Sequence, residues 1–242
     1  MIPTFCVAHK TPTVPAALYN AIIDTMPRAD YDVLIQVAAY PPLLRLATRP
    51  GLIGLCNRRK FILRGGTGND RITPEEAQKL TRADTAPAPD FDFLVSAYPL
   101  NGKTIHSQYL SCHPAVEWED FMALAIEMGV ISEGQRTEVE ESTVLFGGGP
   151  PLGVFPSPFI QGLASRTWPL YAEFARRYSA RITTYDPLQR RVVAFLAERF
   201  ESYFIRKELE RRYPEGIPQQ IFGRLMFVLA EGEAYRPGVV GE

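Results

Sequence analysis

The sequence predicts one α/β domain spanning residues 1–242, with a mixed sheet flanked by helices and a helical C-terminal part. A length of 242 residues fits a single large domain. Hydrophobic residues make up 46% of the chain and charged residues 22%, which is an ordinary globular balance. The predicted elements alternate between strand and helix before the chain becomes mainly helical, and this order favours a sheet covered by helices on both faces.

Short apolar runs predict the strands, at residues 4–8, 31–35, 51–56 and 91–98. The third run is almost continuously apolar, as is typical of a central strand. Apolar residues at every fourth position predict a helix over 15–26. The glycine-rich residues 64–70 predict a surface loop. Thr73, followed by a proline and two glutamates, predicts the start of another helix.

The second half of the chain is predicted to be mainly helical. An apolar stripe over residues 114–128 ends at a glycine, which indicates an amphipathic helix and its C-terminal cap. Further helices are expected at 168–178 and at 186–212. Residues 145–158, rich in glycine and proline, predict an irregular loop, and 221–229 form a last short apolar stretch.

Charge and composition exclude several classes of protein. The formal net charge of −1 argues against a large basic surface for nucleic acid. The three cysteines have neither zinc-site spacing nor the even count of a disulfide framework. No apolar stretch reaches the roughly 18 residues that span a bilayer, and residues 1–10 lack the pattern of a signal peptide. We therefore expect a cytoplasmic protein and leave peripheral membrane contact open.

Polar and cationic side chains follow two predicted strands at the ends where open α/β sheets bind ligands. His9 and Lys10 follow the first strand, and Asn57, Arg58 and Arg59 follow the third. A guanidinium group can pair with two phosphate oxygens at once, and an ammonium group adds a point charge. These residues are candidates for binding a diphosphate; the alternative is a solvated, charged loop.

The last long predicted helix carries Arg191 and Glu198 seven residues apart, and therefore on one face. Glu198 is the candidate general base. Arg191 and Arg199 are candidates for binding an anion or for orienting that base. The alternative is a structural ion pair between helices.

Polar and aromatic side chains are dense just before the predicted helix at 114–128. The candidates for a pocket in this region are His106, Gln108, Tyr109 and His113. The alternative is that both histidines are structural. The motifs of dinucleotide-binding oxidoreductases, P-loop kinases, serine hydrolases and zinc peptidases are missing from the chain, which weakens those four interpretations.

Three stretches resemble a bacterial protein family described as capsular or exopolysaccharide glycosyltransferases. Residues 53–61, I-G-L-C-N-R-R-K-F, are similar to I-G-L-C-H-Y-R-R-Y-F in that family, with Asn57 in place of a histidine. Residues 108–120 share a Gln-Tyr pair, a later histidine and the start of a helix. Residues 191–200, R-V-V-A-F-L-A-E-R-F, resemble R-V-x-G-F-L-A-E-R-L and are the most specific match. The resemblance covers about residues 30–206.

The resemblance implies a GT-A-like fold that binds a nucleotide sugar, most simply a UDP-sugar, at the C-terminal edge of the sheet. Arg58 and Arg59 would then contact the donor phosphates, and Glu198 would be the base. The implied acceptor is a carbohydrate or glycolipid hydroxyl. Asp90 and Asp92 form the acid–any–acid triplet of metal-dependent glycosyltransferases, but the triplet precedes a predicted strand instead of following it. No metal ligand is therefore predicted, and the need for a divalent metal stays open.

Two other functions remain alternatives. One is a catalytically inactive relative that serves as a binding or scaffold module, which the departures from the family motifs favour. The other is a glycosyltransferase that modifies nucleic acid, against which the near-zero net charge argues.

Overall fold

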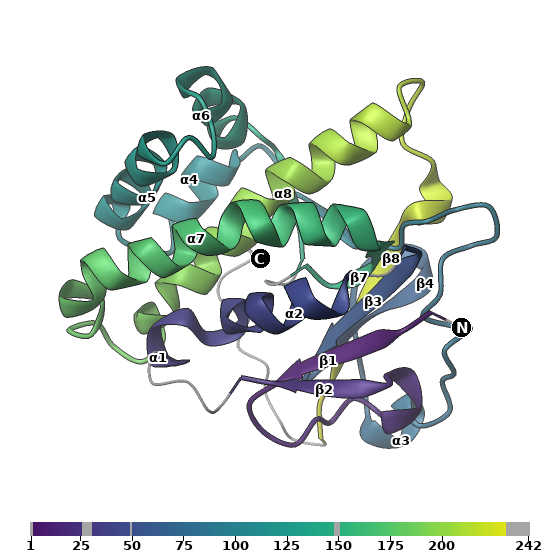
Figure 1. Cartoon of the computed structure of the whole chain (residues 1–242). Helices are drawn as coiled ribbons and strands as arrows, with labels where there is room; N and C mark the ends of the chain where they lie inside the picture. The colour runs from purple at the N-terminus through teal and green to yellow at the C-terminus, as the bar shows by residue number, and fades with distance from the viewer. Residues whose placement is uncertain (1, 26–30, 49, 148–150, 231–242) are drawn as a thin grey trace.

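The computed structural model describes residues 2–25, 31–48, 50–147 and 151–230. The strands are β1 (Thr4–Ala8), β2 (Ala21–Asp24), β3 (Leu52–Asn57), β4 (Lys60–Ile72), β5 (Ala97–Pro99), β6 (Val144–Phe146), β7 (Gly153–Pro156) and β8 (Gly223–Val228). The α-helices are α1 (Tyr31–Leu34), α2 (Tyr40–Leu46), α3 (Pro74–Ala77), α4 (Ile105–Leu110), α5 (Ala115–Glu127), α6 (Glu133–Glu140), α7 (Ser157–Ile182) and α8 (Val192–Arg212) (Figure 1). The 3-10 helices are η1 (Ala16–Leu18), η2 (Ile35–Ala39), η3 (Gln189–Arg191) and η4 (Gln219–Ile221).

The main sheet is mixed and runs in the order β2-β1-β3-β4-β8, with β7 also paired to β3. β1 is parallel to both β2 and β3, whereas β4 and β7 are antiparallel to β3. The C-terminal ends of β1, β2 and β3 therefore meet at one edge of the sheet. This is the edge at which open α/β sheets bind their ligands.

Both halves of β4 pair with β8. Phe61 and Asp70 lie opposite the same residue of β8, Met226. Residues 69–72 run in the same direction as β8. Residues 61–64 run in the opposite direction, since they pair in turn with residues 226, 225, 224 and 223 of β8. Between the two halves, three glycines with φ of +81° to +85° turn the chain. β8 is therefore enclosed by β4 on its two sides.

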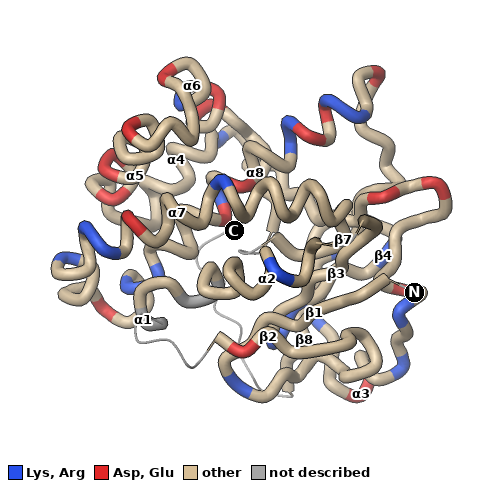
Figure 2. Tube along the Cα trace, viewed as in Figure 1, with Lys and Arg blue, Asp and Glu red and all other residues tan. Residues whose placement is uncertain are grey.

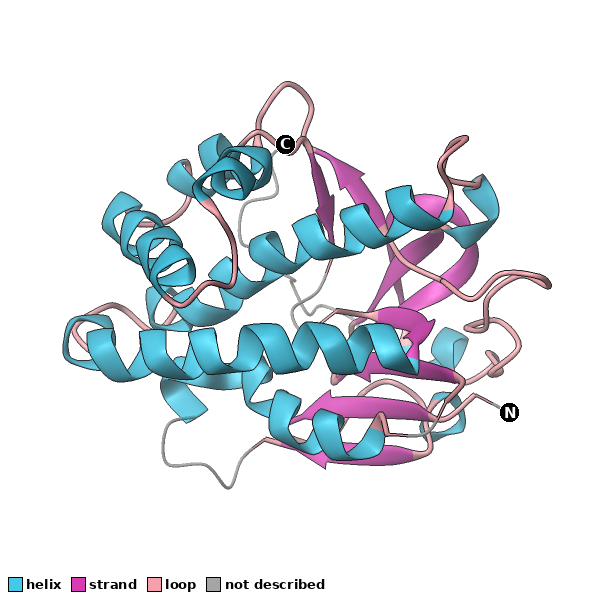
Figure 3. Ribbon diagram, turned by 45° about the horizontal axis from the view of Figure 1, so that its top comes forward, coloured by secondary structure: helices cyan, strands magenta, loops and turns pink. Residues whose placement is uncertain are grey.

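The two faces of the sheet pack against different parts of the chain. Strand alternation sends Val7, Ile53 and Leu55 into the large core shared with α2, α7 and α8. It sends Cys6 and Cys56 into a smaller core that η1 and α3 cover. Figure 3 shows the long helices α7 and α8 side by side on one side of the strands.

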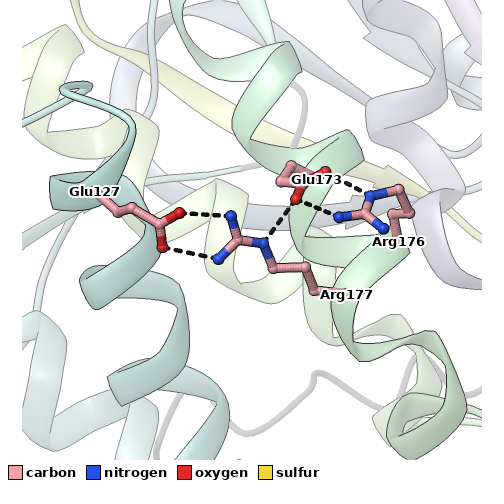
Figure 4. Close-up of polar contacts among 4 residues, drawn as sticks. All are labelled: Glu127, Glu173, Arg176 and Arg177. Carbon is pink, nitrogen blue, oxygen red and sulfur yellow. Dashed lines mark hydrogen bonds and ion pairs between the residues drawn. The ribbon is translucent and has the colours of Figure 1, made fainter.

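Ion pairs tie the helices together at the surface. Acidic and basic residues alternate along the C-terminal half of α8 and over α5 to α7 (Figure 2). Arg177 of α7 donates to Glu127 of α5 over 2.6 Å and 2.8 Å, and also to Glu173 of its own helix over 2.7 Å (Figure 4). Because these groups are largely solvated, the pairs contribute orientation more than stability.

The predicted fold class is confirmed, since the structure is a mixed α/β sheet flanked by helices with a helical C-terminal part. β1 and β3 confirm the strands expected at 4–8 and 51–56, and α5 confirms the helix expected at 114–128. α7 contains the helix expected at 168–178 and is much longer. The helix expected at 186–212 begins with η3 and continues as α8.

Four expectations for local structure are wrong. Residues 31–34 form a helix and not a strand, because a short apolar run fits a buried helix equally well. The helix expected over 15–26 is replaced by η1 and the edge strand β2. Residues 64–70 belong to β4, because the distant β8 supplies their backbone partners. The loop expected at 145–158 contains the end of β6 and all of β7.

The strand expected at 91–98 is only partly formed. It is reduced to β5, preceded by isolated bridges at Leu94 and Val95. Residue 26 at the end of the first expected helix, residues 148–150 of the expected loop and the tail after 230 lie outside the described residues.

Candidate functional site

The turn between β3 and β4 lies at the C-terminal edge of the sheet and presents two arginines. Arg58 N donates to Val7 O over 3.2 Å, which joins the turn to the end of β1. Arg58 Nε donates to Thr11 O over 3.1 Å, and Thr13 N donates to Arg58 O over 2.8 Å. These contacts hold the loop after β1 against the turn, so the residues that follow β1 and β3 share one surface.

Asn57 shapes this turn. Its side chain is buried, and its Oδ1 accepts a hydrogen bond from Arg59 N over 3.1 Å. Asn57 therefore supports the backbone that carries Arg58 and Arg59.

Positive charges converge on His9 at this edge. Partial burial lowers the pKa of His9, and the charges of Lys10, Arg58, Arg191 and Arg59 lower that pKa further. Arg191 reaches the group from η3, in the helical layer, although it lies more than 180 residues further along the chain. The structure thus brings the predicted donor-binding cations close enough to His9 for their charges to add to the effect of burial on its pKa.

A stack of side chains leads from this cation cluster into the helical layer. The Arg191 guanidinium lies over the Phe195 ring, 5.5 Å from its centroid. The other members of the stack are His113, whose ring is 4.2 Å from that of Phe195, and Tyr109, 4.9 Å from His113. His113 Nδ1 lies 3.0 Å from Gln189 Oε1. Burial, together with the nearby Arg199 charge, lowers the pKa of His113 to about 4, so this ring is neutral.

Arg199 joins α8 to α4 through neutral partners. It is only 3% exposed, and burial lowers its pKa. Its Nε donates to Gln108 Oε1 over 2.8 Å, its Nη1 donates to Phe195 O over 2.8 Å, and its guanidinium lies 5.3 Å from the Tyr109 ring centroid. Gln108, Tyr109, His113 and Arg199 therefore form one cluster, in which Arg199 of α8 joins three of the four residues proposed as a pocket.

His106 lies apart from that cluster. At about 100° per residue it points to nearly the opposite side of α4 from Gln108. Its ring packs 5.6 Å from Trp118, and its Nε2 lies 3.9 Å from Glu119 Oε1. Both of these neighbours of His106 belong to α5, and the Trp118 ring also lies 5.0 Å from that of Tyr109.

Glu198 is half-buried on α8, one residue before Arg199. Its charge acts on Arg199 and on Glu201, and its carbonyl accepts a hydrogen bond from Ser202 Oγ over 2.7 Å. Seven residues separate it from Arg191, which corresponds to about 10 Å along a helix axis and nearly two full turns. The two side chains therefore leave almost the same face of the helix.

Sequence reasoning missed two polar residues in this layer. Gln189 contacts His113 and also donates from Nε2 to Cys112 O over 2.9 Å. Glu201 is 1% exposed and accepts hydrogen bonds at Oε1 from the hydroxyls of Tyr40 and Tyr171. The aromatic residues around Glu201 in the same predicted helix were the sequence signal that this glutamate could be buried.

The acid–any–acid triplet does not resemble a metal site. Asp92 is paired with Arg212, and Asp90 adopts a left-handed conformation with φ of +69°. Within residues 2–25, 31–48, 50–147 and 151–230, no three acidic, histidine or cysteine side chains are grouped as metal ligands would be. Among the helices in those ranges, none combines the length and the apolar character needed to cross a bilayer.

Comparison with known proteins finds a shared fold. Neither a protein-family model nor a curated protein matches the chain, so the resemblance to the bacterial glycosyltransferase family stays a prediction. A solved structure described as the apo form of the bifunctional glycosyltransferase WbbM matches with a TM-score of 0.64 and 10% sequence identity. The match covers 94% of this chain but 45% of that one. The chain therefore has a fold found in a glycosyltransferase structure and spans less than half of its length.

Proposed function

We propose that the chain is a glycosyltransferase that moves a sugar from a nucleotide diphosphate donor, in the first instance a UDP-sugar, to a hydroxyl of a carbohydrate or glycolipid. The acceptor would belong to a surface polysaccharide under assembly in the cytoplasm. One observation carries this proposal: hydrogen bonds join the turn that bears Arg58 and Arg59 to the end of β1, where the charges of Lys10, Arg58, Arg59 and Arg191 act on His9. The fold shared with a glycosyltransferase structure supports it.

The proposed reaction exchanges one bond at the sugar for another. The bond between the anomeric carbon and the diphosphate oxygen breaks, and its electron pair stays on the diphosphate. A new bond forms between the anomeric carbon and the acceptor oxygen, whose proton passes to Glu198. Cations around His9 would stabilise the charge that develops on the leaving diphosphate, while Glu198 would be the base.

The arrangement along η3 and α8 supports this division of roles. Arg191, at the end of η3, belongs to the cation cluster, and Glu198 follows two turns later on nearly the same face of the helix. The two positions lie about 10 Å apart along the helix axis, and the donor diphosphate and the transferred sugar would lie between them. The cluster of Gln108, Tyr109, His113 and Arg199 lies beside Glu198 and would line the acceptor side.

A screen of nucleotide sugars by thermal shift and donor hydrolysis tests the proposal. A ligand at 100 times its dissociation constant stabilises a protein by about 2.7 kcal/mol. We expect one nucleotide sugar to raise the melting temperature and to be slowly hydrolysed. Glu198→Ala should abolish hydrolysis and keep binding, and Arg59→Ala should weaken binding. The matched control is Glu141→Ala, which removes an exposed glutamate from the end of α6.

The possible outcomes separate the alternatives. Binding without hydrolysis or transfer by the wild-type chain would support a non-catalytic binding module. If no nucleotide or nucleotide sugar shifts the melting of the folded wild type, the proposed donor site is wrong.

A further inference from the structure

The cation cluster also bears on the need for a metal. We propose that Lys10, Arg58, Arg59 and Arg191 neutralise the donor diphosphate themselves, so that donor binding at this edge requires no divalent cation. This inference rests on the proposed function, because it assumes that a nucleotide diphosphate occupies the edge.

The side chains at the edge do not fit a divalent metal. Mg²⁺ and Mn²⁺ are held by oxygen ligands, mainly carboxylates, together with phosphate and water oxygens. Among the strand residues that the structure describes, the register brings the carboxylate of Asp24 to this edge, opposite Ala8 at the end of β2. The charges that lower the pKa of His9 belong to lysine and arginine side chains. The triplet that would supply carboxylates lies elsewhere, with Asp92 engaged by Arg212.

The electric field at the edge favours an anion over a cation. The positive charges of Lys10, Arg58, Arg191 and Arg59 lower the pKa of His9, in addition to the larger effect of its partial burial. The field that removes a proton from the imidazole would also repel a divalent ion and attract a diphosphate. The chain as a whole has a net charge of −1, so this positive region is local and not a property of the whole surface.

The cations come from separate segments that are already held in place. Arg58 is fixed by Thr11 O, and the Arg59 backbone by the Asn57 side chain. Arg191 is held over the Phe195 ring in the helical layer. A diphosphate between these segments would receive paired donors from guanidinium groups and a point charge from Lys10, which is the role that a bridging metal has in other sites.

Calorimetric titration of UDP into the EDTA-stripped chain tests the inference, with Mg²⁺ or Mn²⁺ added in parallel runs. We expect the same dissociation constant with and without metal, and weaker binding as NaCl is raised. Lys10→Gln and Arg59→Gln should each weaken UDP binding about tenfold. Lys103→Gln, at an exposed lysine just before α4, should bind as the wild type does.

The three results that would overturn the inference can be told apart. UDP binding that appears only with Mg²⁺ or Mn²⁺ would overturn metal independence and leave the proposed donor site standing. UDP binding that is absent under all conditions, from a chain that still melts cooperatively, would overturn the donor site and this inference with it. If UDP binds in EDTA but Lys10→Gln and Arg59→Gln bind as tightly as the wild type, the cluster is not where the diphosphate lies.

Discussion

Replacing Glu201 with glutamine should remove a large part of the pH dependence of stability. The Glu201 carboxyl is buried between α2, α7 and α8, and both tyrosine hydroxyls donate to the same oxygen, Oε1. Among the described residues, its Oε2 has no hydrogen-bond partner. Desolvation by burial raises the pKa of Glu201 from 4.5 to about 8, against the opposing effect of the two tyrosine hydrogen bonds.

The sign and size of the effect follow from proton linkage. Below pH 4.5 the carboxyl is protonated in the folded and unfolded chains alike. Between pH 4.5 and 8 the unfolded chain loses this proton while the folded chain keeps it, so stability falls by about 1.4 kcal/mol per pH unit. From pH 5.5 to 8 the loss is about 3 kcal/mol. Glutamine is neutral in both states, and its carbonyl oxygen can accept the same two hydrogen bonds.

Urea unfolding of the wild type and of Glu201→Gln at pH 5.5, 7 and 8 measures this difference. We expect the variant to gain about 3 kcal/mol relative to the wild type as the pH rises from 5.5 to 8. Glu210→Gln, at a half-exposed position of the same helix, is the matched control and should stay parallel to the wild type. Parallel stability curves for the wild type and Glu201→Gln would show that the folded carboxyl titrates normally, and the reasoning would be refuted.

Three further predictions test the packing and the charges. Gly153→Ala should lower the free energy of unfolding in urea by about 3 kcal/mol, because Gly153 has φ of +128° and an added Cβ would lie 2.0 Å from Leu94 O. Gly162→Ala is the control: it lies in α7 with open space around it and should raise the free energy of unfolding by about 0.5–1 kcal/mol. Similar effects of the two substitutions would contradict the predicted clash at Gly153. Glu117→Gln should lower the free energy of unfolding by about 1–2 kcal/mol, because the Glu117 carboxylate is fully buried and accepts hydrogen bonds from Arg181 of α7 over 2.7 Å and 3.0 Å. An unchanged midpoint of urea unfolding would contradict this prediction. NMR titration should find the pKa of His113 near 4, and the free energy of unfolding should fall as the pH drops below 6.5. A His113 titration midpoint near 6.5 would mean that the ring is solvated.

Local signals predicted those parts of the fold that local interactions determine. Thr73 was assigned as a helix cap, and its Oγ1 accepts from Glu76 N over 3.2 Å in a full capping box. The apolar run at 51–56 was read correctly because a central strand is buried on both faces. By contrast, Ile22 fitted a helical stripe but lies 48% exposed on the edge strand β2, where neighbouring backbone decides the conformation.

The sequence allowed individual candidate residues to be named, but it did not show how they would be arranged in space. The cationic run at 57–60 and the R-V-V-A-F-L-A-E-R-F stretch were visible in the sequence, whereas the approach of Arg191 to His9 depends on how the helical layer packs on the sheet. Glu201 was missed because charged residues are rarely fully buried. The roles assigned to the individual residues stay predictions until ligand binding is measured.

The enclosure of β8 by the two halves of β4 has a consequence for how the chain acquires its structure. About 150 residues separate these partners, so their pairing closes a very large loop and has a high contact order. During synthesis β4 leaves the ribosome long before β8 exists, and its two halves lack the strand that lies between them. Late completion of the sheet should make this region a slow step in folding, and until β8 arrives the exposed edges of β4 are open to wrong partners.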